Sequence, residues 1–148
     1  MRLGSMADRR LEPPDDLAPT SAWAGEGVQL ELPPLAQEIC RRYRLEFPDE
    51  PQRYGSAVDA WCVHDTQHLL NWAAEAVGGY VDLTTEIGWL ASVLEARGFP
   101  IERLARNLDI AADVVLEAVH GAFGRELGHE LASAAAFVRS RGTFLPVT

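Results

Sequence analysis

Lysine is absent from this chain of 148 residues, and all 13 of its basic side chains are arginine. An enzyme that forms a Schiff base needs a lysine amine, and a P-loop places a lysine against the bound phosphates. The sequence excludes both chemistries. It also contains no G-x-S-x-G motif and no glycine-rich phosphate loop, so the usual markers of a hydrolase elbow and of a nucleotide site are missing.

Cysteine occurs only twice, at Cys40 and Cys62. Both positions fall on the apolar faces of predicted helices. A cysteine in such a place behaves as a small apolar residue that is shielded from solvent. The sequence therefore predicts two buried free thiols.

Long apolar runs are missing as well. None approaches the ~20 residues that span a bilayer, and the N-terminus lacks the apolar core of a secretory signal. We expect a cytoplasmic location and no membrane partner. Residues 1–5 have the character of a vector-derived leader, with the native start at Met6.

Positive charge is scarce. The formal net charge is −9 and the isoelectric point is about 4.8. An acidic surface repels nucleic acid phosphates and anionic lipids, because like charges raise the energy of association. The composition therefore predicts no nucleic acid partner.

Strict alternation of apolar and polar residues, the mark of a half-buried strand, is missing over any length that would build a sheet. Apolar residues recur instead at helical spacing. The predicted helices cover residues 34–47, 52 or 56–77, 82–97, 101–119 and 123–141. We expect an all-α fold in which four to five helices form an antiparallel bundle or a globin-like packing.

The chain divides into three parts by composition. Residues 1–32 are rich in proline, glycine and small residues, and we expect a flexible N-terminal arm. Trp23 either docks this arm against the body, which is the preferred interpretation, or is an exposed partner contact. Residues 33–142 form a single helical domain. Residues 143–148 form a C-terminal tail.

Asp65 falls where the pattern requires an apolar residue. In the predicted helix that ends at Val77, it lies on the same face as Cys62, Leu69 and Trp72. A buried carboxylate is costly unless it is paired, hydrogen-bonded or protonated. His68, one turn further on, is the expected partner.

Tryptophans surround this polar spot. Trp61, Trp72 and Trp89, together with Tyr80, are placed to line an apolar pocket beside Asp65 and His68, and small-ligand sites have this composition. The alternative is an aromatic core in which Asp65 accepts indole hydrogen bonds. The predicted ligand-binding residues are those that flank this pocket: Trp61, Asp65, His68, Trp72 and Trp89.

His64 and His68 form an H-x-x-x-H pair, which turns two imidazoles to one side of a helix and suits a shared metal ion. The spacing leaves the third ligand open among Glu86, His120 and His129. The interpretation that the sequence favours is a surface His64 and a His68 bound to Asp65. The sequence identifies no cofactor.

No complete catalytic set accompanies Asp65. Acid–base chemistry by Asp65 and His68 would need a nucleophile, and Cys62 is expected to be packed too deeply to react. We therefore predict no catalytic residues, and the sequence favours a protein that is not an enzyme without deciding the question.

Residues 104–118 resemble a helix-turn-helix motif, with a small residue at Ala105, a turn at Asp109 and Val115 packing back. The second helix would then offer Asp113 and Glu117 where DNA contacts need basic or amide side chains. A continuous helix is the better interpretation, and DNA binding is the weakest hypothesis.

The sequence thus favours a non-enzymatic helical regulatory, sensory or adaptor module. Such a module would act through protein–protein contacts, including a homodimer, or through a small ligand bound near Asp65, His68 and the tryptophans. A metal-binding bundle that uses His64 and His68 is the main alternative.

Overall fold

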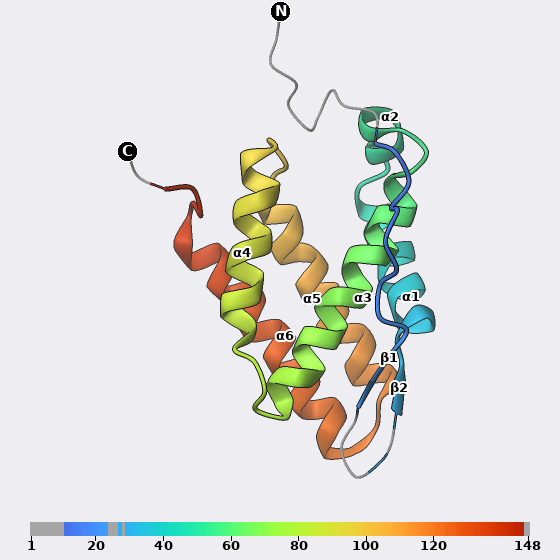
Figure 1. Cartoon of the computed structure of the whole chain (residues 1–148), viewed down its shortest axis with the longest axis vertical. Coiled ribbons are helices and arrows are strands. Elements are labelled where there is room, and N and C mark those ends of the chain that lie inside the picture. The colour runs from blue at the N-terminus through green and yellow to red at the C-terminus, as the bar shows by residue number, and fades with distance from the viewer. Residues whose placement is uncertain (1–10, 24–26, 28, 147–148) are drawn as a thin grey trace, which may run out of the picture.

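The computed structural model describes residues 11–23, 27 and 29–146. These residues form six helices and one small antiparallel sheet (Figure 1). The strands are β1, Ser21–Trp23, and β2, Gln29–Glu31. The helices are α1, Leu32–Glu46; α2, Glu50–Tyr54; α3, Val58–Val77; α4, Leu83–Ala96; α5, Ile101–Ala118; and α6, Gly121–Arg141. The predicted all-α fold is confirmed.

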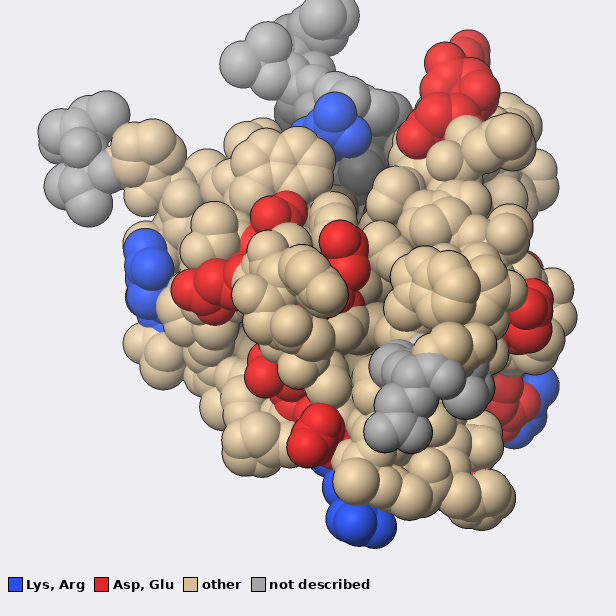
Figure 2. Space-filling view, turned by 60° about the horizontal axis from the view of Figure 1, so that its bottom comes forward, with Lys and Arg blue, Asp and Glu red and all other residues tan. Residues whose placement is uncertain are grey.

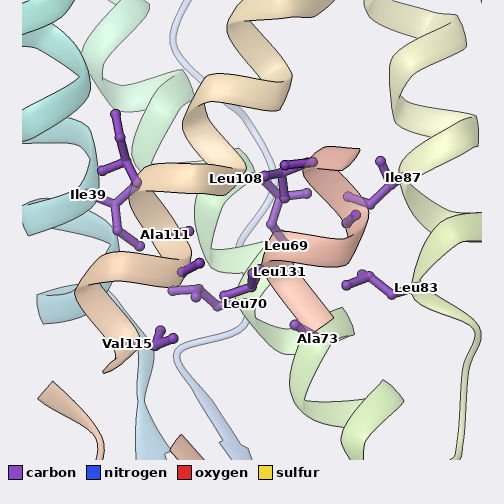
Figure 3. Close-up of a cluster of buried hydrophobic side chains, with 14 of the residues drawn as sticks. Ile39, Leu69, Leu70, Ala73, Leu83, Ile87, Leu108, Ala111, Val115 and Leu131 are labelled. Atoms are coloured by element: carbon purple, nitrogen blue, oxygen red, sulfur yellow. The ribbon is translucent and has the colours of Figure 1, made fainter. Parts of the chain in front are cut away.

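Helices α5 and α6 form the central antiparallel pair. Helices α1 and α3 pack together against this pair, and α4 packs on α6 from the other side (Figure 1). Leu69 of α3, Leu108 of α5 and Leu131 of α6 are fully buried where these elements meet (Figure 3). Ile87 extends the same core towards α4. One continuous apolar core therefore holds the bundle together.

Local sequence explains the end of α3 and the start of α4. Helix α3 ends at Val77, and Gly79 follows with a backbone φ of 81°, a conformation that glycine adopts at little cost. Helix α4 begins after Asp82, whose side chain accepts a hydrogen bond of 3.1 Å from the backbone N–H of Thr84. Both boundaries match the sequence prediction.

Gly55 separates two helices where the sequence predicts one that starts at residue 52 or 56. Its backbone φ is 95°, which side chains with a Cβ atom rarely adopt. The resulting bend turns the short helix α2 across the N-terminal end of α3, as Figure 1 shows. Glu50 and Tyr54 become buried at this bend.

Helix α5 is continuous from Ile101 to Ala118, and Asp109 lies inside it. The turn that a helix-turn-helix motif needs at Asp109 is therefore missing. This continuous helix agrees with the preferred interpretation of the sequence.

Glycines of α6 allow close packing within the chain. A Cβ atom on Gly128 would lie 2.7 Å from Cγ of Leu116 on α5, and one on Gly124 would overlap the backbone carbonyl of Val119. These two glycines therefore serve the contact between α5 and α6.

The buried face of α3 differs from the predicted one. Thr66, Leu70 and Ala74 are buried, whereas Cys62 and Trp72 are only half-buried. The single-face pattern was wrong because α3 is central: it packs on α1, α4, α6 and β1, so it is buried on more than one side.

The N-terminal segment lies along α3 (Figure 1). Gln67 donates a hydrogen bond of 2.8 Å to the carbonyl oxygen of Pro19, and the Trp61 indole donates one to the carbonyl oxygen of Glu12. Trp23 in β1 is 65% exposed, so the prediction that it docks the arm was wrong. Residues 1–10 of the predicted arm lie outside the described residues.

The thiols are not free. Cys40 of α1 and Cys62 of α3 form a disulfide whose Cα atoms lie 6.0 Å apart. The prediction of two free thiols was wrong because it treated each helix face separately. Packing of α1 against α3 brings the two faces together.

None of the described helices is long and apolar enough to cross a membrane.

Candidate functional site

A cavity of about 600 Å³ opens between the N-terminal part of α3, the C-terminal part of α4 and the N-terminal part of α5. Ligand pockets of proteins have volumes of this order. Leu90 and Leu94 of α4, Leu69 of α3 and Leu104 of α5 supply much of its apolar wall. Phe99, in the turn before α5, extends the same wall.

The predicted ligand-binding residues meet at this cavity. Trp61, Asp65, His68 and Trp72 line it from α3, at successive turns of the helix. Trp89 lines it from α4 and is 60% exposed, so it stands at the rim. Tyr80, which the sequence added to this group, is 83% exposed and lies outside the cavity lining.

Two residues that line the cavity each carry a buried polar atom with no hydrogen-bond partner among the described residues. These atoms are Oδ1 of Asn107 and the hydroxyl of Tyr54, and both are shielded from bulk solvent. The other end of the Asn107 amide donates a hydrogen bond of 3.3 Å to the hydroxyl of Thr66, which fixes the side chain in place. A buried polar atom without a partner is costly, and native structures contain few of them.

Asp65 pairs with His64 rather than with the predicted His68. Nδ1 of His64 lies 3.0 Å from Oδ1 of Asp65, and Nε2 lies 3.1 Å from Oδ1 of Asp16. The His64 side chain is only 11% exposed, so the surface position that the favoured interpretation gave it was wrong. His68 lies next to it in an edge-to-face arrangement, with 4.9 Å between ring centroids.

The two histidines have different proton affinities. Burial lowers the pKa of His64, but hydrogen bonds to Asp65 and Asp16 outweigh this effect and raise the pKa overall. Burial and the neighbouring His64 lower the pKa of His68. The pKa of Asp65 is raised because surrounding protein disfavours its charged form, although His64 opposes this rise.

A buried ionic network supports the end of the cavity next to α2. Glu50 is 2% exposed and accepts a hydrogen bond of 2.6 Å from the Tyr43 hydroxyl and one of 2.9 Å from the Arg103 guanidinium. Arg103 also donates to Asp49 and lies 4.4 Å from the centroid of the Phe47 ring. Because every charge in this network has a partner, the network fixes the positions of α1, α2 and α5 relative to one another.

Sequence reasoning missed four residues of this region: Asp16, Glu50, Tyr54 and Asn107. Asn107 left a usable signal, since it falls on the apolar stripe of its helix between Leu104 and Leu108. The other three come from segments read as an arm or as a break between helices, where periodicity carries no information.

The residue that lies with His64 and His68 is not one of the three predicted candidates for a third ligand. Within the described part of the chain, the metal-compatible cluster that contains His64 and His68 is completed by Asp16. Both His120 and His129 are exposed residues of the α6 region, and Glu86 belongs to α4. None of these three is part of the cluster.

No protein-family model, curated protein or solved structure matches this chain. The geometry of the cavity, and of the Asp16, His64 and His68 cluster at its edge, is therefore the basis for assigning a function.

Proposed function

We propose that this protein binds a small, largely apolar molecule in the cavity between α3, α4 and α5. The proposal rests on the combination of an apolar lining with two buried polar atoms, Asn107 Oδ1 and the Tyr54 hydroxyl, that have no partner among the described residues. A few polar groups within an apolar cavity give a small-molecule site its orientation and specificity.

The groups around the cavity favour one kind of ligand. Aromatic rings of Trp61, Trp72 and Phe99 line it, and they suit a flat apolar or aromatic body. Asn107 Oδ1 accepts hydrogen bonds, and Asp65 adds a carboxylate. A ligand with a hydroxyl or amine donor would complement these acceptors.

Fluorescence titration with Nile red, a neutral apolar dye, tests whether the cavity accepts a ligand. We expect saturable binding of one dye per chain. Val93→Trp adds an indole to the cavity wall and should weaken binding at least tenfold. Ala132→Trp places the same indole on an exposed position of α6 and should leave binding unchanged. Equal binding by both variants would contradict the proposal.

We propose a sensory or regulatory role for this binding, because the described residues that line the cavity include no serine and no free cysteine. Self-association as a homodimer belongs to the same proposal. Light scattering after size exclusion tests self-association, and a strict monomer at high concentration would contradict it.

The face in Figure 2 carries few, separated basic side chains, which supports the absence of a nucleic acid partner.

The cytoplasmic location that the sequence predicts is not part of the proposal. The disulfide between Cys40 and Cys62 weighs against a reducing compartment, where structural disulfides are rare.

A further inference from the structure

Three side chains with metal-binding atoms meet at the edge of the cavity. One ligand atom each from Asp16, His64 and His68 lies within 4.8 Å of the other two. The histidines are four positions apart on α3, so their imidazoles project from the same side of the helix. Asp16 comes from the N-terminal segment that lies along this helix.

Asp65 holds the His64 ring in the orientation that a metal ligand needs. Nδ1 of His64 lies 3.0 Å from Oδ1 of Asp65, and Nε2 lies 3.1 Å from Oδ1 of Asp16. A metal ion bound by Nε2 and Asp16 would take the place of the Nε2 proton. Metal-binding histidines commonly donate their second ring nitrogen to a carboxylate in this way, which fixes both the tautomer and the ring orientation. Asp65 is therefore a positioning residue for this cluster.

The segment that carries Asp16 is fixed on both sides of the cluster. Trp61 donates to the carbonyl oxygen of Glu12, and Gln67 donates to that of Pro19. Three successive contacts with α3, made by residues 12, 16 and 19, thus follow the helix in order. The Asp16 carboxylate reaches the histidines from a segment whose backbone is already positioned.

We propose that Asp16, His64 and His68 bind a divalent first-row transition metal ion, Zn²⁺ in the first instance, which ties the N-terminal segment to α3 at the edge of the cavity. Two imidazoles and one carboxylate form a ligand set that suits zinc and its neighbours. Ligand atoms around tetrahedral zinc lie roughly 3.3 Å apart, as bond lengths of about 2 Å require. Small side-chain rotations close the cluster to this spacing, and they leave a coordination position open.

Cobalt and zinc titrations of protein purified without an affinity tag and freed of metal by a chelator test this site. We expect one Co²⁺ per chain, with the visible absorption of a tetrahedral complex, and displacement by Zn²⁺. Asp16→Asn and His68→Gln should each weaken binding at least tenfold. His129→Gln, at an exposed histidine of α6, should bind as the unmodified chain does.

Hydrogen exchange separates a three-ligand site from a histidine pair alone. Zn²⁺ should slow amide exchange in residues 12–20 of the unmodified chain, and Asp16→Asn should abolish this protection. Binding that survives Asp16→Asn unchanged, or no stoichiometric binding at all, would overturn the inference. Nile red binding to the metal-free protein is measured separately, so the cavity proposal stands or fails on its own.

Discussion

The Nδ1 atom of His64 lies 3.0 Å from the Oδ1 atom of Asp65, one residue further along α3. This contact replaces the predicted pairing of Asp65 with His68. It gives the carboxylate a hydrogen-bond donor at the cavity wall, and it turns the other nitrogen of the imidazole towards Asp16.

Removing Asp65 should weaken the hold on this imidazole. We expect Asp65→Ala to lower the free energy of unfolding by about 1–3 kcal/mol, because His64 loses the more buried of its two carboxylate partners. Chemical denaturation measures the difference. Asp113→Ala, at an exposed position of α5, should change stability by less than about 0.5 kcal/mol. Equal effects of the two substitutions would show that the contact contributes nothing.

The buried network around Glu50 should be strongly stabilising. Tyr43→Phe removes the donor of a 2.6 Å hydrogen bond to the Glu50 carboxylate, and we expect a loss of about 1.5–3 kcal/mol, the range for bonds to charged groups. Tyr80→Phe changes the same atom on an 83% exposed ring and serves as the control. Indistinguishable denaturation curves for the two variants would contradict this account of the network.

Tyr54 should behave in the opposite way. Its hydroxyl is buried and has no partner among the described residues, so Tyr54→Phe removes a desolvated polar atom and breaks no hydrogen bond. We expect the thermal midpoint to stay the same or to rise. A fall comparable to that of Tyr43→Phe would mean that the hydroxyl is satisfied in the folded protein.

The disulfide between Cys40 and Cys62 predicts a thiol count. Protein purified without reductant and then denatured should show no reactive thiol, and both cysteines should react after reduction. Reduction should lower the free energy of unfolding by about 2–4 kcal/mol, because the unfolded chain regains freedom. A Cys40→Ala/Cys62→Ala double variant should not respond to reductant. Two reactive thiols before reduction would refute the pairing.

Acid should weaken the fold through Glu38. Hydrogen bonds from Arg41 and Arg42 lower its pKa from 4.5 to about 2. A carboxylate with a lowered folded-state pKa stabilises the protein above its unfolded pKa, and this stabilisation is lost as the pH falls towards the folded value. Stability should therefore fall between about pH 5 and pH 2. This fall should be shallower in Glu38→Gln, and high salt should reduce the difference because Glu38 is near the surface. Parallel pH curves for the two proteins would count against the ion pairs.

The helices were predictable because their limits have local causes. Asp82 caps α4, and glycines follow α3 and α4 where each ends. Trp61, Asp65 and Trp72 were found at the cavity because a carboxylate among tryptophans breaks the helical pattern. These signals come from residues that are neighbours in the sequence, so they can be recognised without knowledge of the fold.

The remaining features depend on contacts between distant segments. Cys40 meets Cys62 through the packing of α1 on α3, and Arg103 meets Glu50 across 53 positions of the chain. Asp16 reaches His64 only because the N-terminal segment lies along α3. Helical periodicity carries no information about such pairs, so the pairing of His64 with Asp16 could not be predicted.

The central claim is that the cavity binds a small apolar molecule that carries a hydrogen-bond donor. The most direct measurement compares the affinities of 2-naphthol, which has one donor, and 2-methoxynaphthalene, which has none. We expect the unmodified chain to prefer 2-naphthol about tenfold, the value of one hydrogen bond. Asn107→Leu should largely remove this preference. Equal affinities in the unmodified chain, or no binding of either compound, would contradict the claim.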